Sequence, residues 1–538
     1  MKSKYIIKSN CIFDSIKSEP YEGFIVVKDN VIQAVGTDPC EMDKYLEPNI
    51  KIYEFKNKLV MPGFHDSHTH LLLAGLYKAC ANMGAARSEE EAVHMLYDFE
   101  KAHPTEGWVY GFNWYHVFWD NKALPTRFSL DHFFPDRPVF LVNAEAHGAW
   151  VNSKALEIAG ITKDTPDPAG GYFERDEHGE PTGFIYESAM GAVTKYALDF
   201  TEQREKQLIK TYMEDAISKG ITSVNDMKPF FHGLVGRMET YDSLDKSGEL
   251  KIRINAAADL LGDLGEAEIW RKKYKSGKFR VNLLKQFLDG VCTTHTALML
   301  EEYIDSPGNF GVELNDLKAI ENSVLEAHKR GFNIRLHSCG DKSARLALDF
   351  YQNAIELYGK KSCRHGIEHI EVIKHEDIPR FKQFGIIPSV QPEHLALTQT
   401  FEENPYPMVL GKERADKNWP FRSLYDAAGC LAIGSDCPIV DNDPFFEIYR
   451  AITRVHNDGK PEGGWNPTEK LSLYQVLKSY TYGSAYGVCR ENELGTLEPG
   501  KLADIIVIDR NLFTIEPKEI LNSEVLLTIV DGDIVFEQ

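Results

Sequence analysis

The stretch MPGFHDSHTH, residues 61–70, follows an apolar run and holds three histidines and one aspartate within six positions. Burying so many polar side chains at the end of a strand is costly unless a partner satisfies them. On an extended segment, side chains two positions apart point to the same side, so His68 and His70 can chelate one divalent cation such as zinc. The stretch therefore indicates a metal site.

Further residues that could complete this site follow later strand-like runs. With His68 and His70, the candidates are Lys285, His337, His369 and Asp436. Taken singly, each has an ordinary interpretation: Asp436 could cap a helix, and Lys285 could be solvated. In a barrel, however, the carboxyl ends of the strands meet at one face, where enzymes of this architecture build their sites. The six residues together predict a metal centre, in which Asp436 binds metal or acts as a base.

The middle of the chain alternates between strand-like and helix-like segments, which favours a parallel sheet. Helix-like segments, for example 314–331 and 341–359, separate the strands. The apolar or β-branched runs are residues 59–67, 221–227, 252–259, 281–290, 332–338, 363–370, 386–392 and 430–436. Eight strands with intervening helices predict an α/β fold, a (β/α)8 TIM-like barrel.

Both ends of the chain read instead as short strands joined by turns. We predict a composite β-sandwich domain from residues 1–60 and 486–538, in which Asp531-Gly-Asp forms a hairpin turn. Residues 61–485 would form the barrel. An insertion at about 75–205 interrupts it and contains a probable hairpin in GGYFERDEHGEPTGFIYE.

Aromatic and histidine side chains outside the metal centre are candidates for contacts with substrate. These candidates are Trp114, His147, Trp150 and His394. For the two tryptophans, packing in a core is the slightly favoured interpretation. We interpret His65 as structural or as a support for the ligands. The remaining histidines considered, His328, His375 and His456, are expected at the surface.

The composition describes a soluble globular protein. The formal net charge of −21 argues against a nucleic-acid partner, which would require a basic surface. No apolar stretch approaches the roughly 18–20 residues of a membrane span. The nine cysteines are scattered without a CxxC pair, which indicates reduced thiols in a cytoplasmic protein. The partner expected is a small-molecule substrate, and a homo-oligomer such as a dimer stays open.

With these residues in view, the chain resembles the amidohydrolase superfamily. More narrowly, it is similar to the amidohydrolase family 3 group, the YtcJ-like enzymes that include N-substituted formamide deformylase. The resemblance covers nearly the whole chain. It rests on PGFHDSHTH, HGAWVNSKALEIAGI, TPDPAGG, GEPTGFIYE, KQFLDG, HSCGD, RHGIEH, QPEH, GSDCP and GTLEPGKLADIIVID, in this order. Where the family often shows HAIGD this chain has HSCGD, so Cys339 could affect the pocket, whereas the ligand His337 is unchanged.

The resemblance implies one or two divalent metal ions, with zinc expected, on the carboxyl face of the barrel. His68 and His70 would hold the more buried ion. Lys285 would be carboxylated by CO2 and bridge two ions. His337 and His369 would hold the second ion. Asp436 would bind metal and serve as the base.

We therefore predict a metal-dependent hydrolase that cleaves a non-peptide C–N bond, of amide or N-formyl type, with metal-activated water. The chain contains no HExxH, GxSxG or Walker motif that would support another hydrolytic mechanism. Two alternatives stay open. One is another amidohydrolase chemistry: deaminase, lactonase or cyclic-imide hydrolase. The other is a catalytically silent ligand-binding protein.

Overall fold

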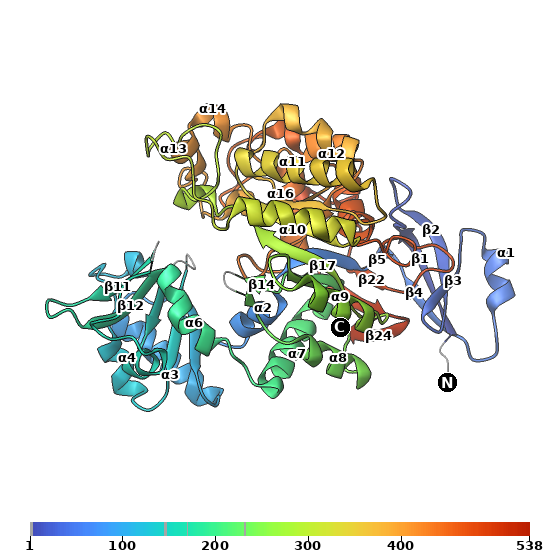
Figure 1. Cartoon of the computed structure of the whole chain (residues 1–538). Helices are drawn as coiled ribbons and strands as arrows, with labels where there is room; N and C mark the ends of the chain where they lie inside the picture. The colour runs from blue at the N-terminus through green and yellow to red at the C-terminus, as the bar shows by residue number, and fades with distance from the viewer. Residues whose placement is uncertain (1–3, 145–147, 169–170, 231–232) are drawn as a thin grey trace. The chain divides into compact units, whose positions relative to one another are not determined.

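The computed structural model describes residues 4–144, 148–168, 171–230 and 233–538 (Figure 1). The chain divides into two compact units, which are described separately. Unit 1 consists of Met1–Leu71, Met213–Pro229 and Tyr241–Gln538, and unit 2 of Leu72–Tyr212 and Phe230–Thr240. No helix in the described ranges combines the length and the apolar character that crossing a membrane requires.

Unit 1 contains a sheet of eight strands in which all neighbours are parallel. In order, the strands are β6 (Phe64–Thr69), β13 (Ile221–Asp226), β16 (Arg253–Asp259), β17 (Phe279–Phe287), β18 (Asn333–Ser338), β19 (Gly366–His369), β20 (Ile387–Val390) and β21 (Ala432–Ile433). A parallel bridge from Thr69 to Cys437 leads back to the first strand, so that the barrel is nearly closed. The predicted (β/α)8 TIM-like fold is confirmed.

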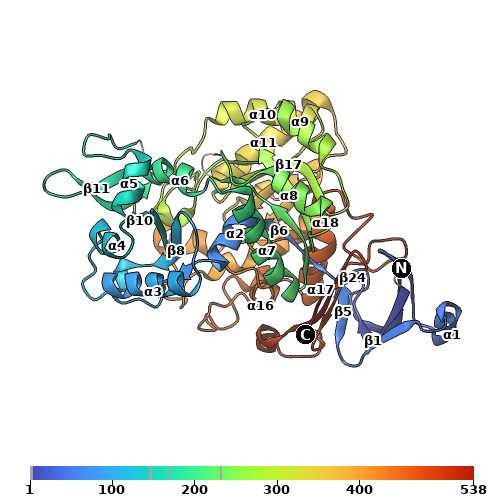
Figure 2. The ribbon, with the colours of Figure 1, turned by 90° about the horizontal axis from the view of Figure 1, so that it is seen from below.

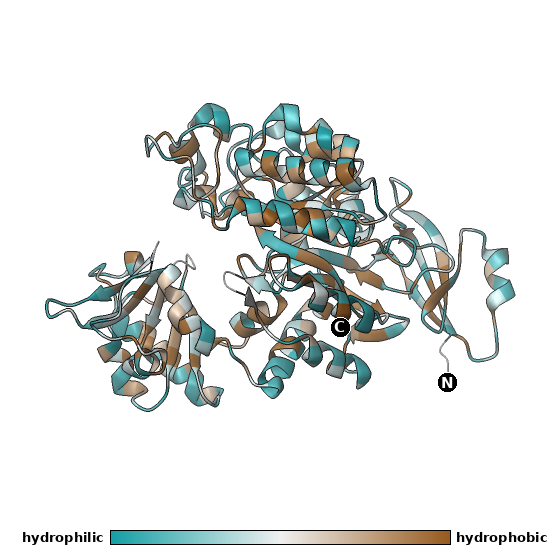
Figure 3. Cartoon of the chain, viewed as in Figure 1, coloured by the Kyte–Doolittle hydropathy of each residue, from teal (hydrophilic) through white to brown (hydrophobic). Residues whose placement is uncertain are grey.

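Helices between the strands cover the outside of this barrel. Helix α10 (Leu317–Lys329) is capped by Asp316, whose carboxylate accepts hydrogen bonds from the backbone N–H groups of Lys318 and Ala319. Its buried face, which includes Ile320 and Val324, has the helical spacing that the sequence shows. The next helix, α11 (Asp341–Tyr358), packs beside α10, and both are two-coloured in the hydropathy view (Figure 3).

The first predicted strand, 59–67, is in fact two strands. β5 (Leu59–Pro62) pairs antiparallel with β22 (Ile505–Ile508) in the terminal sheet, whereas β6 belongs to the barrel. Gly63 lies between them, and its N–H donates to the carbonyl of Asp504 at 3.0 Å. A Cβ at this position would lie 2.2 Å from Thr222 Cγ2, so only glycine allows the chain to pass so close to β13.

The strands of the two chain ends form one mixed sheet. Its order is β24 (Asp533–Glu537), β23 (Val525–Val530), β22, β5, β1 (Lys4–Ile12), β2 (Tyr21–Lys28) and β3 (Val31–Gly36), with β4 (Lys51–Phe55) paired to β1. Strands β1, β5 and β24 lie near one another in both views (Figures 1 and 2). Ile7, Ile25, Val507 and Ile529 share one buried core. A small β domain built from both ends is thus confirmed; its boundaries at 60 and 486 stay a prediction.

The turn between β23 and β24 has the conformation that its sequence predicts. Asp531 has φ +58° and Gly532 has φ +81°, and a two-residue type I′ hairpin requires both to be positive. The predicted hairpin is confirmed.

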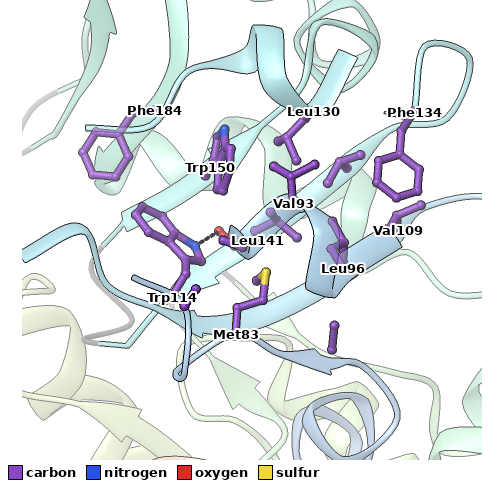
Figure 4. Close-up of a cluster of buried hydrophobic side chains, with 14 of the residues drawn as sticks. Met83, Val93, Leu96, Val109, Trp114, Leu130, Phe134, Leu141, Trp150 and Phe184 are labelled. Carbon is purple, nitrogen blue, oxygen red and sulfur yellow. Dashed lines mark hydrogen bonds between the residues drawn. The ribbon is translucent and has the colours of Figure 1, made fainter. Parts of the chain in front are cut away.

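Unit 2 contains most of the predicted insertion and is built on a six-stranded sheet. The order is β11 (Gly171–Arg175), β12 (Pro181–Glu187), β10 (Gly148–Val151), β9 (Val139–Asn143), β8 (Val109–Trp114) and β7 (Ala81–Asn82). β11 and β12 are antiparallel, which confirms the hairpin predicted there. Trp114 and Trp150 lie fully buried in the core of this unit, beside Phe184 (Figure 4).

Candidate metal centre

Residues from several barrel strands meet at the carboxyl ends of those strands within unit 1. His68 lies near the end of β6 and His369 is the last residue of β19, whereas Asp436 follows β21. The Nε2 atom of His68 is 3.3 Å from Asp436 Oδ1, and Nε2 of His70 is 3.4 Å from the same oxygen. These ligand atoms form a buried group that could hold a metal ion. The strand ends thus bring together residues that are up to 368 positions apart.

The second pair of predicted histidines joins this group. The ring of His369 lies near that of His337, with centroids 4.3 Å apart, and near that of His68, with centroids 5.0 Å apart. His394, predicted only as a contact for substrate, lies in the short helix η6 (Pro392–Ala396) after β20. Its Nε2 atom is 3.8 Å from Asp436 Oδ2, and with His369 and Asp436 it forms a second possible ligand group. His394 is therefore as well placed to bind metal as to touch substrate.

Two of these residues have unusual backbone conformations. His369 has φ +73° and Asp436 has φ +61°, in the left-handed region that residues other than glycine rarely adopt. The Asp436 N–H donates to the carbonyl of His68 at 2.7 Å, which ties the two strand ends together. Strained residues of this kind persist where the surroundings fix them, often at functional sites. Here the left-handed turn directs both side chains into the cluster.

Lys285, on β17, is fully buried, and its Nζ atom has no hydrogen-bond partner among the described residues. Burial lowers the pKa of this ammonium group, which favours the neutral amine. A neutral amine can react with CO2 to form a carbamate, whose two oxygens could then bind metal. An orphaned buried amine beside several imidazoles fits the metal site that the sequence predicts.

The protonation states also suit a metal site. Burial, and then the charge of Lys285, lower the pKa of His68 and bring that of His337 to about 3. Neutral imidazoles offer the lone pairs that a metal requires. Burial alone would raise the pKa of Asp436, but the surrounding histidines, His68 foremost, hold it well below its usual range. His68 and His337 are thus neutral nitrogen donors, and Asp436 is an ionised carboxylate.

Glu368 is a supporting residue that the sequence reasoning missed. It is fully buried, and its Oε2 atom lies 2.8 Å from Nδ1 of His68. Its other oxygen is 3.3 Å from Nε of the buried Arg335. A carboxylate that accepts the Nδ1–H of a histidine fixes the tautomer and makes Nε2 the metal-facing atom. The signal in the sequence was a glutamate inside the strand HGIEH, next to a predicted ligand.

Asp289, in the motif KQFLDG, organises the loops beneath the centre. It accepts the backbone N–H groups of Leu298, Cys339 and Gly340 at 2.9–3.1 Å. Because Cys339 follows β18, this carboxylate holds the segment that leaves His337. The Cys339 sulfur lies 3.4 Å from His337 Nε2, so the departure from the family pattern falls directly beside a predicted ligand.

The remaining predicted contacts for substrate lie elsewhere. The indole N–H of Trp114 donates to the carbonyl of Leu141 at 3.1 Å, and that of Trp150 donates to Thr126 at 2.8 Å (Figure 4). The packing interpretation of both tryptophans is therefore observed, and a contact with substrate stays a prediction. His147 lies outside the described residues.

The histidines expected outside the centre differ in outcome. His65 is buried and its Nε2 lies 3.1 Å from Asn225 Oδ1, in keeping with a structural role. His375 is exposed, as expected. The prediction for His328 and His456 is wrong, because both are 1% exposed. His328 lies on the buried face of α10, and the identity of this one residue does not show which face of the helix it occupies.

Comparisons with known proteins place the chain in a family. Residues 51–536 match the amidohydrolase family. The chain is 30% identical to the protein LONG AFTER FAR-RED 3 of Arabidopsis thaliana, covering 98% of this chain and 90% of that one. It is 29% identical to the putative amidohydrolase YtcJ of Bacillus subtilis, covering 96% of both. It is also 26% identical to the N-substituted formamide deformylase of Arthrobacter pascens, covering 96% and 95%.

A solved structure has the same fold. An uncharacterized metal-dependent hydrolase from Pyrococcus horikoshii superimposes with a TM-score of 0.80 at 24% identity, covering 95% of this chain and 99% of that one. The fold is shared with that structure, and the class that the sequence defines is that of the amidohydrolases. The chain belongs to the amidohydrolase family, as the motifs predicted, and it is an enzyme of that family.

Proposed function

We propose that this protein hydrolyses a non-peptide C–N bond, of amide or N-formyl type, in a small molecule. The observation that carries the proposal is the buried group of imidazoles around the ionised Asp436, at the carboxyl face of the barrel. The relative named N-substituted formamide deformylase supports the choice of bond.

The residues that would hold the metal are those that the strand ends bring together. They are His68, His70, Lys285, His337, His369 and Asp436, with His394 beside them. Nitrogen donors with one carboxylate suit zinc. A cation held there would acidify a bound water and polarise the carbonyl group of the substrate. Carboxylation of Lys285 would supply the oxygens for a second ion.

Asp436 is the residue best placed to move the proton. Its carboxylate is ionised and accepts a proton when water attacks the carbonyl carbon. The amine must leave in its protonated form, so Asp436 returns that proton to the leaving nitrogen. Glu368 keeps His68 in one tautomer, and Arg335, 3.3 Å from the other carboxylate oxygen, holds Glu368 in place, so that the cluster holds its geometry through the cycle.

We further propose that the enzyme acts in the cytoplasm. None of the nine cysteines forms a disulfide in the described part of the chain, and five thiols of unit 1 are buried, among them Cys292, Cys339 and Cys437. Unpaired thiols are typical of a reducing compartment.

The experiment that tests the function is a comparison of substrates with and without metal. We expect purified enzyme to contain a divalent transition metal, to lose activity in strong chelator and to regain it with zinc. A panel of N-formyl and N-acyl amines should be hydrolysed in preference to aminopurines, lactones and cyclic imides. Preference for one of those three groups would assign another amidohydrolase chemistry, and full activity after exhaustive chelation would refute the metal mechanism.

A further inference from the structure

A second group of metal-binding side chains lies away from the centre described above. It consists of His328, on α10, and of Cys363 and His365, which precede β19. Nδ1 of His328 is 2.8 Å from Nε2 of His365. The Cys363 sulfur is 3.9 Å from each of these two nitrogens. Both histidines are buried, whereas Cys363 is partly exposed, which leaves the group open to solvent on one side.

This group is separated from the catalytic centre by the length of a strand. His365 stands just before β19, and His369 is the last residue of that strand. Four residues of extended chain span about 13 Å, so the two groups cannot share one ion. The group therefore lies at the amino end of the barrel, where this fold uses residues for stability and not for catalysis.

Neighbouring contacts orient both rings. The Nε2 atom of His328 lies 2.9 Å from the carbonyl oxygen of Gly359, so Nε2 carries the proton and Nδ1 presents its lone pair to the group. The ring of His365 stacks on Tyr351, with centroids 4.7 Å apart and an interplanar angle of 14°. A carbonyl oxygen behind one imidazole is the arrangement that commonly supports a metal ligand.

We propose that His328, Cys363 and His365 bind a transition-metal ion of the zinc type at a site independent of the catalytic centre. The three separations admit a point about 2.0–2.1 Å from each nitrogen and about 2.3 Å from the sulfur, the distances that zinc prefers. The ion replaces the proton of the Cys363 thiol, which is released to solvent. The proton that His365 Nε2 donates to His328 moves to His365 Nδ1, an atom without a hydrogen-bond partner among the described residues. Water completes the coordination.

A nucleophilic role for the same residues is disfavoured. Burial raises the pKa of the Cys363 thiol to about 11, although Lys361 and Arg271 oppose the change. The free thiol is therefore protonated at neutral pH, whereas a nucleophilic cysteine needs a thiolate. In addition, the neighbouring histidines are hydrogen-bonded to each other, so neither is poised as a general base for sulfur. Metal binding uses all three side chains together.

The site can be tested with cobalt, because a thiolate bound to Co²⁺ gives a charge-transfer absorption in the near ultraviolet. We expect the full-length protein loaded with Co²⁺ to show this absorption. Cys363→Ser should lose the absorption together with about one metal equivalent per chain. His328→Gln should weaken binding in the same way. His68→Ala should lose metal from the other centre and retain the absorption, so failure of the catalytic proposal would be seen separately.

Two further thiols serve as controls. Cys40→Ser changes an exposed thiol in α1 (Pro39–Met42) and should leave the spectrum unchanged. Cys339→Ala removes the thiol beside His337 and should also retain the absorption. An absorption that disappears only in Cys339→Ala would overturn the proposal. Equal metal content and equal spectra in wild type and Cys363→Ser would overturn it as well.

Discussion

The two ends of strand β19 carry two histidine groups of different composition. At the carboxyl end, His369 meets Asp436 and several other imidazoles, and Glu368 holds His68 from behind. At the amino end, His365 meets one further imidazole and one thiol, with no carboxylate among the possible ligands. The first group contains the carboxylate that we propose as the base for proton transfer; among the described residues, the second group contains no carboxylate ligand.

The difference shows how one strand can serve two purposes. Hard oxygen ligands and an open position suit an ion that handles water and substrate, whereas thiolate and imidazole suit an ion with a structural role. The left-handed conformation of His369 also occurs only at the carboxyl end, because His365 is not among the residues with positive φ. Four variants test whether the two groups differ in function.

The largest effect is expected for Asp436→Asn. The amide keeps the shape of the side chain but cannot take up the proton, so kcat should fall by about 10³-fold or more. Metal analysis should show most of the metal still bound, and the cobalt–thiolate absorption should be unchanged. Activity within tenfold of wild type would remove Asp436 as the base.

Lys285→Ala should cause the second-largest loss of activity. The variant lacks the amine that CO2 can modify, so activity should fall by about 10²–10³-fold, with loss of metal from the carboxyl end alone. A short-chain carboxylate such as acetate could occupy the space and should restore part of the activity. Lys285→Met, which fills that space, is the matched control and should not be rescued. Equal response of both variants to acetate would contradict the carbamate.

Glu368→Gln should have an intermediate effect. The amide can still accept a hydrogen bond from His68 but lacks the charge that strengthens this ligand. Metal affinity at the catalytic centre should therefore drop by about 10–100-fold, measured by titration with a competing chelator. Excess metal should then restore most of the kcat, because no reacting group is lost. Unchanged affinity would show that Glu368 does not support the ligand.

Cys363→Ser should have the smallest effect on catalysis. Because His365, the member of the group next to β19, lies about 13 Å from His369 along the strand, kcat/KM should remain within about twofold of wild type while the cobalt–thiolate absorption disappears. A large loss of activity with unchanged thermal stability would show that the histidine groups at the two ends of β19 act together in catalysis.

Much of the architecture could be predicted from local patterns. All eight barrel strands fall within or beside the predicted runs, and the turn at Asp531 and Gly532 has its expected conformation. The division of the run 59–67 could not be predicted, because the residues do not show which strand each half pairs with. Only the partners decide it: β5 pairs with β22, and β6 pairs with β13.

The candidate metal ligands could be predicted from the sequence because residues of ligand type follow the predicted strands. Glu368 was missed because a glutamate within a strand gives no sign of its partner, His68 Nδ1. His328 was assigned to the surface because the inward face of α10 depends on what packs against it.

The sequence by itself determined the order of strands and helices, the types of ligand and the membership of the amidohydrolase family. Side-chain periodicity and residue chemistry are local properties, and they can be read without partners. The tertiary structure alone decided that His394 and Glu368 adjoin the centre, that the tryptophans fill a core, and that His328 faces Cys363 and His365. Each of these contacts joins residues from separate segments of the chain, and such contacts form only when the chain folds.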